Sequence, residues 1–73
     1  MAINYAYNFA EIDDATNMCI GVITTTNPDA EGPTGGGTTF VPIPSYDDGY
    51  MFKYYIDGTW FEDPNGTIPY IPA

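Results

Sequence analysis

Two pairs of adjacent carboxylates, Asp13-Asp14 and Asp47-Asp48, are the residues of this sequence that most resemble catalytic or metal-binding groups. Glycoside hydrolysis needs its two carboxylates on opposite sides of a bound sugar, whereas neighbouring residues of a strand point to opposite faces. Both pairs also lie in segments that we predict to be turns. The stretch DDATN does not have the ligand spacing of a twelve-residue calcium loop. We therefore expect solvated turn acids and no metal site.

The sequence also contains few residues that could act as a nucleophile or hold a cofactor. Cys19 is the only cysteine, and the chain has no histidine. A reactive cysteine needs a neighbouring base or positive surroundings to lower its thiol pKa, and zinc needs a cluster of Cys and His ligands. The three consecutive glycines at residues 35–37 lack the lysine and the following helix of a phosphate-binding loop. The sequence predicts a protein that is not an enzyme and that binds no cofactor.

Aromatic side chains are concentrated in one stretch, KYYIDGTWFED, at residues 53–63. Asp57-Gly58 between two aromatic-rich runs predicts a β-hairpin with a two-residue type I′ turn. That loop length would set Lys53, the only basic side chain, opposite Glu62. Cross-strand pairs of opposite charge stabilise a hairpin, so we predict that Lys53 and Glu62 hold its register.

The same register divides the hairpin into two faces, because opposed residues share a face and successive residues alternate. Tyr55 would lie opposite Trp60, on the face of Lys53 and Glu62, and we predict that this face is available to a partner. The other face is predicted to cover the core with five residues: Phe52, Tyr54, Ile56, Thr59 and Phe61.

Two further strands are predicted in the first third of the chain. Residues 2–9 place large apolar side chains at alternate positions, which is typical of a half-buried strand. Residues 18–25 are rich in β-branched side chains. The acidic, turn-forming stretch between them predicts that the two strands form a hairpin.

Glycine and proline shape the prediction for the middle of the chain. Residues 26–39 contain three consecutive Gly and two Pro, which predicts a flexible loop. Pro42 and Pro44 remove two backbone donors, so residues 40–44 should be an edge strand or a polyproline-like segment. No segment combines helical spacing with caps, so no helix is expected. The predicted fold is all-β, a small antiparallel sheet of two hairpins and a proline-rich edge segment, in one domain over residues 1–73.

Length and charge bear on the partners. A 73-residue chain is close to the size at which a single core is only marginally sufficient, and one cysteine cannot form an internal disulfide. We therefore expect a homo-oligomer, a dimer or a trimer, or docking on a larger protein. The net charge of −9 disfavours binding to nucleic acid or to an anionic membrane. The chain has no signal-peptide pattern and no run of about 20 apolar residues, which predicts use in a cytoplasm.

Seven Tyr, four Phe and one Trp exceed what so small a core needs, although aromatics can also supply core volume. Tyr and Trp are enriched where protein surfaces meet partners, because they combine a large contact area with a polar group. The candidate partner-binding residues are Tyr5, Tyr7, Tyr55, Trp60 and Tyr70.

The order MCIGVITTT, then VPIPSYDDGYMFKYYIDGTWFED, then a proline-rich end resembles a family of small proteins of tailed bacteriophages, commonly encoded among tail-fibre and other virion structural genes. The resemblance covers residues 18–69 and is interrupted by the glycine-rich loop. It implies a component of the virion, assembled in the host bacterial cytoplasm, that acts through protein–protein contacts. Fibres of this kind are usually trimeric, which agrees with the expectation from chain length.

Two functions follow from these features. The first is a non-enzymatic structural or accessory protein of a phage virion, contacting itself or a larger virion protein. The alternative is an acidic inhibitor of a host defence protein, occupying a nucleic-acid-binding or basic groove. The positions of the acids separate the two, because mimicry needs one continuous acidic stripe. The acids in question are Asp13, Asp14, Asp29, Glu31, Asp47 and Asp48. A sugar-binding module, a third possibility, would need an exposed Trp60.

Overall fold

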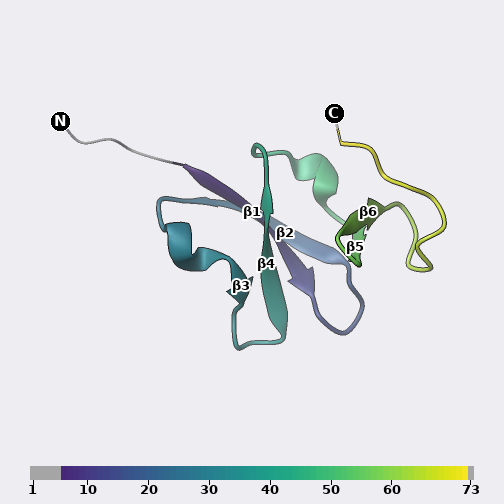
Figure 1. Ribbon diagram of the computed structural model, residues 1–73, viewed down its shortest axis with the longest axis horizontal. Helices are drawn as coiled ribbons and strands as arrows, with labels where there is room; N and C mark the ends of the chain where they lie inside the picture. Colours follow the sequence, from purple (N-terminus) through teal and green to yellow (C-terminus); the bar gives the residue numbers. More distant parts are fainter. Residues whose placement is uncertain (1–5, 73) are drawn as a thin grey trace.

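The computed structural model describes residues 6–72 and contains a four-stranded and a two-stranded antiparallel sheet (Figure 1). The larger sheet has the strand order β2-β1-β4-β3, and the smaller one pairs β5 with β6. The all-β prediction is confirmed. The strands are β1 (Tyr7–Asp13), β2 (Cys19–Thr25), β3 (Gly32–Pro33), β4 (Thr38–Ile43), β5 (Tyr54–Ile56) and β6 (Thr59–Phe61).

The first hairpin is present, but its first strand runs further along the chain than predicted. β1 begins at Tyr7 and continues to Asp13, through residues expected to turn; residues 2–5 of the predicted strand lie outside the described residues. The alternation of more and less buried side chains continues to the end of β1: Ile12 points into the core, whereas Glu11 and Asp13 are less buried. Opposite this end, β2 contains a bulge, since Glu11 pairs with Gly21 but Ile12 pairs with Cys19.

Residues 26–39 carry more regular structure than a flexible loop. Asn27 caps a single 3₁₀ turn, η1 (Pro28–Ala30), by accepting a hydrogen bond from the Asp29 amide at 3.0 Å. The chain then forms β3, which pairs with Thr39 and Phe40 of β4. The sequence predicted a flexible loop for this segment, and the structure shows short regular elements there, because side-chain caps and strand pairing compensate for the glycines.

The proline-containing strand is not a simple edge strand. β4 lies between β1 and β3, and it pairs with β1 along its whole length. β3 begins opposite Phe40 and reaches no further along β4, so the outer side of β4 has no partner strand at Pro42 among residues 6–72. A residue without an N–H is tolerated there because no ladder bond is required on that side.

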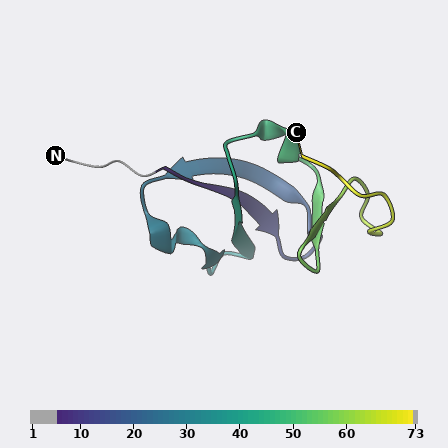
Figure 2. The same cartoon turned by 45° about the horizontal axis from the view of Figure 1, so that its top comes forward.

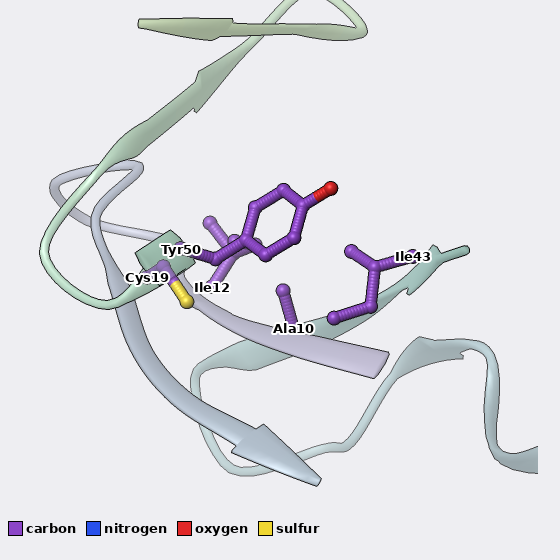
Figure 3. Packing of buried hydrophobic residues seen from close by; sticks show 5 residues of the cluster. All are labelled: Ala10, Ile12, Cys19, Ile43 and Tyr50. Atoms are coloured by element: carbon purple, nitrogen blue, oxygen red, sulfur yellow. The ribbon is translucent and has the colours of Figure 1, made fainter. Parts of the chain in front are cut away.

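The main core lies on one face of the four-stranded sheet, beneath Tyr50. Tyr50 belongs to a second 3₁₀ turn, η2 (Asp48–Tyr50), whose cap Asp47 accepts from the Gly49 amide at 2.8 Å. Figure 3 shows the Tyr50 ring above β1, between Ile12 and Ile43. The buried cluster consists of Ala10, Ile12, Cys19, Ile43 and Tyr50.

The opposite face of the sheet buries a second aromatic. Phe9 is 3% exposed, and its ring lies 6.1 Å from that of Phe40. Figure 2 shows η1 and β3 below the β1–β2 pair and η2 above it, so short segments cover both faces. The two 3₁₀ turns are the only helical structure in residues 6–72, and neither is long or apolar enough to span a membrane.

The second hairpin is attached to the outer side of β2 by backbone hydrogen bonds. The Cys19 amide donates to the Lys53 carbonyl at 2.7 Å, and the Phe52 amide donates to the Cys19 carbonyl at 2.8 Å. The Tyr55 amide donates to the Asn17 carbonyl at 2.9 Å. These bonds join the two sheets and determine which face of the hairpin turns toward the core.

Candidate interaction surface

The β5–β6 hairpin has the expected register. Tyr55 lies opposite Trp60, and Asp57 and Gly58 both have positive φ, 51° and 81°, as a type I′ turn requires. Lys53 lies at the base of the hairpin, just before β5.

Lys53 makes the predicted ion pair with Glu62, at 2.7 Å between Nζ and Oε1. The same ammonium lies 5.1 Å from the centre of the Tyr70 ring, within the range of a cation–π contact. The hydrogen bond to Glu62 raises the pKa of Lys53. The only basic side chain of the sequence is therefore held between Glu62, directly after β6, and Tyr70 of the C-terminal strip (residues 67–72), and it contacts both segments.

The faces of the hairpin are the reverse of those predicted. Tyr55 and Trp60 pack against the buried cluster, whereas Phe52, assigned to the core, is 65% exposed. The cause is the docking on β2, because the bonds made by Lys53 and Tyr55 rotate the Tyr55–Trp60 face toward the sheet. Phe52 has a φ of 66°, so the backbone turns there and directs its side chain outward.

Four aromatic rings form a continuous cluster between the hairpin and the sheet. The Tyr50 ring lies 4.7 Å from that of Trp60 and 5.8 Å from that of Tyr70, and Tyr55 lies 5.0 Å from Trp60. Edge-to-face and tilted pairs of this kind stabilise a core beyond the area that they bury. Burial raises the pKa of Tyr50. Trp60 is thus part of the packing, and it does not offer the open ring that a sugar would need.

The other predicted partner-binding residues have different surroundings. Tyr7 is half-buried at the start of β1, and Tyr70 is half-buried against Tyr50 and Lys53. Tyr5 lies outside the described residues. Their role in binding a partner stays a prediction, although the structure shows that Tyr55, Trp60 and Tyr70 serve the core.

The large apolar side chains that reach solvent are a different set. Within residues 6–72 there are five, between 42% and 84% exposed, and none was predicted from the sequence to bind a partner: Ile20, Tyr46, Phe52, Ile68 and Ile71. The exposure of Ile68 and Ile71 could have been predicted from the sequence, since each directly precedes a proline in a segment that cannot form a full ladder. The exposure of Phe52 could not have been predicted from the residues around it in the sequence, because strand alternation assigns its side chain to the face predicted to cover the core.

The acidic residues mainly organise turns. Asp63 accepts hydrogen bonds from the Thr67 amide, the Thr67 hydroxyl and the Ile68 amide, at 3.0, 2.6 and 2.9 Å. These donors lower the pKa of Asp63. Asp13 accepts from the Thr16 hydroxyl at 2.8 Å, and Asp14 accepts from Thr39 at 2.7 Å.

No group of three or more His, Cys, Asp or Glu residues is arranged to hold a metal ion within the described chain. Cys19 is completely buried, and desolvation raises the pKa of its thiol, which donates to the Gly21 carbonyl at 3.3 Å. A raised pKa reduces the thiolate fraction that a nucleophile requires. The described surface also contains no pocket.

No protein-family model matches this chain, and neither a curated protein nor a solved structure is detectably similar to it. The geometry of the chain itself is therefore the basis for the functional inferences that follow.

Proposed function

We propose that this chain is a non-enzymatic structural or accessory protein that works by protein–protein association, as a component of a tailed-phage virion assembled in the cytoplasm of the host. The motif order of residues 18–69 supports the virion setting. The observation that carries the proposal is the exposed apolar set of Ile20, Tyr46, Phe52, Ile68 and Ile71.

This apolar set is large for the size of the core. Six apolar residues are buried in residues 6–72, against five large ones exposed at 42% or more. Single exposed apolar residues are ordinary, but so high a ratio in a small domain favours a surface that is covered in the assembled state. The net charge of −9 keeps the free subunit dispersed before assembly.

The acidic-inhibitor alternative receives less support from the geometry. A mimic of nucleic acid needs carboxylates that are free and aligned. Of the acids named for such a stripe, Asp13 and Asp14 accept hydrogen bonds from the hydroxyls of Thr16 and Thr39, and Asp47 accepts one from the Gly49 amide in a different turn. These acids are occupied with local structure, which favours the structural role.

Solution mass, measured by light scattering behind size-exclusion chromatography over a dilution series, tests the proposal. We expect a defined assembly for the wild type and a roughly thirtyfold weaker one for Phe52→Asn, because a buried Phe contributes on the order of 2 kcal/mol. Asn tolerates the positive φ at this position, so the thermal midpoint should change little.

Trp60→Ala provides the matched control, because its ring packs against Tyr50 and Tyr55. It should lower the thermal midpoint, which separates loss of folding from loss of association. A wild-type chain that stays monomeric at all concentrations would contradict self-association. The inhibitor hypothesis, tested by binding to host defence proteins, would then take first place.

A further inference from the structure

The outer edge of β2 is open along residues 20–25. β2 is the terminal strand of the four-stranded sheet. Its outer side is occupied by the hairpin only at Asn17 and Cys19. In an antiparallel ladder, alternate residues direct both N–H and C=O away from the neighbouring strand. Residues 20–25 therefore present backbone donors and acceptors that no other described residue pairs with.

The remaining strand edges in the described part of the chain are protected. β3 has two residues and ends at Pro33, and Pro42 occupies the outer side of β4. β6 is covered by the C-terminal strip, since the Glu62 amide donates to Ile68 and the Tyr70 amide donates to Trp60. Proteins commonly protect edges with short strands, prolines, charges or covering segments. Residues 20–25 contain no proline and no charged side chain, so this edge alone is left ready for pairing.

The distribution of charge along the sequence indicates which partner can pair with the outer edge of β2. The chain carries −9 overall, yet residues 15–28 contain no Asp, Glu, Lys or Arg. Two copies of an acidic protein repel each other wherever their carboxylates meet, but a neutral strand can oppose its own copy without a like-charge pair. Charges more than about 8 Å away are largely screened at physiological ionic strength. This neutral edge is thus a surface through which a second copy can approach.

Apolar side chains adjoin the same edge. Ile20, at the bulge, is 42% exposed, and the 65% exposed Phe52 donates its amide to the carbonyl of Cys19, the residue before Ile20. Pairing of the edge would remove part of both side chains from water. Apolar burial and backbone pairing would then act together, as in other cases of strand addition.

We propose that two copies of the chain pair through the outer edges of β2, antiparallel and about a two-fold axis, so that their four-stranded sheets join into one. The inference rests on the proposed function, for which it names the partner and the surface. Two opposed residues of an antiparallel ladder either both direct their backbone groups to the partner or both direct them away, so a two-fold axis passes beside one residue. An axis at Val22 sets Ile20 opposite Thr24, and an axis at Ile23 sets Gly21 opposite Thr25.

Symmetric cross-linking tests this geometry. Opposed Cα atoms of an antiparallel pair are about 4.5–5.5 Å apart, within the range that a disulfide spans. Two variants, Val22→Cys and Ile23→Cys, would each be made in a Cys19→Ala background and oxidised separately at neutral pH. We expect one of the two to give a covalent dimer of twice 8.0 kDa, while the other and a Val41→Cys control on β4 stay monomeric in denaturant. No disulfide in either variant, or equal cross-linking of all three, would overturn the inference.

A second measurement uses charge. Thr24→Asp places a carboxylate on the edge and should weaken the dimer by about tenfold or more in light scattering, because two like charges then face one interface. Thr59→Asp adds the same charge to an exposed threonine of β6 and should leave the mass unchanged. Added salt should strengthen the wild-type dimer by screening the repulsion between the two copies.

The outcomes separate this inference from the proposed function. An oligomer that Thr24→Asp does not affect, and that gives no disulfide at Val22 or Ile23, would overturn edge pairing and leave association through another surface intact. A wild-type monomer at every concentration would remove both. A dimer that weakens with salt would contradict the assignment of a second copy across a neutral edge.

Discussion

Asp63 shows at the residue scale how this protein uses its acids. Its carboxylate binds two amides and a hydroxyl from Thr67 and Ile68, and it thereby fixes the turn that returns the chain along β6. The bonds favour the charged form, which is why its pKa lies below the ordinary value of 3.8. The residue that looks like a solvated surface acid is thus a structural element of the C-terminal strip.

This pKa gives a dependence of stability on pH. Because the pKa is lower in the folded chain than in the unfolded chain, the stabilising contribution is complete above 3.8 and is lost as the pH falls through the folded pKa. We expect Asp63→Asn to lower the thermal midpoint at neutral pH and to flatten its further loss below about pH 4. Circular dichroism melts over a pH series would measure both effects.

Glu31→Gln is the control for that experiment, because Glu31 is exposed at the end of η1. Its melting temperature should follow the wild type across the series. If Asp63→Asn and the wild type lost stability in parallel on acidification, the assigned role of the Asp63 carboxylate would be wrong.

At the scale of the element, the β5–β6 hairpin depends on its two-residue turn. Gly58 has a φ of 81°, which glycine adopts readily and other residues do not. The strands on either side have only three residues each, so a strained turn has few ladder bonds to oppose it. The turn is therefore a sensitive point of the hairpin.

We expect Gly58→Ala to destabilise the protein by about 1 kcal/mol or more, measured by urea unfolding followed through Trp60 fluorescence. Gly36→Ala is matched to it, because Gly36 does not have a positive φ and a Cβ there would meet only Thr34 Oγ1, at 3.7 Å. That variant should lose little stability. Equal losses in the two variants would show that the I′ turn does not limit the hairpin.

At the scale of the whole molecule, Cys19 lies at the junction between the two sheets. Its backbone bonds to Lys53 and Phe52, and its side chain belongs to the buried cluster. The junction couples the hairpin to the four-stranded sheet, since exposure of the thiol requires the two to separate. The reactivity of this thiol therefore reports on the coupling.

Alkylation of Cys19 should be slow in the native protein and should accelerate with urea in parallel with the change in Trp60 fluorescence. Burial and the raised pKa both suppress the thiolate. Asn65→Cys, exposed at a turn and placed in a Cys19→Ala background, should react promptly without denaturant. Prompt labelling of native Cys19 would instead show that the hairpin opens separately from the sheet.

The features that depend on neighbouring residues could be predicted from the sequence alone. The alternating pattern specified strands, Asp57-Gly58 specified the turn, and the loop length then set Lys53 opposite Glu62. These are local consequences of side-chain period and turn chemistry, so few other structures compete with them. The all-β class followed for the same reason.

Which surfaces are buried depends instead on the way the elements pack in three dimensions. Both faces of the second hairpin carry large aromatics, so their composition does not distinguish the inner from the outer face. Backbone hydrogen bonds between Cys19 and residues 52–53, which are far apart in the sequence, determine which face of the hairpin is the inner one. They place Trp60 inward and Phe52 outward. The inner position of β4 and the open edge of β2 have the same origin, because non-local pairing depends on the whole arrangement of the chain.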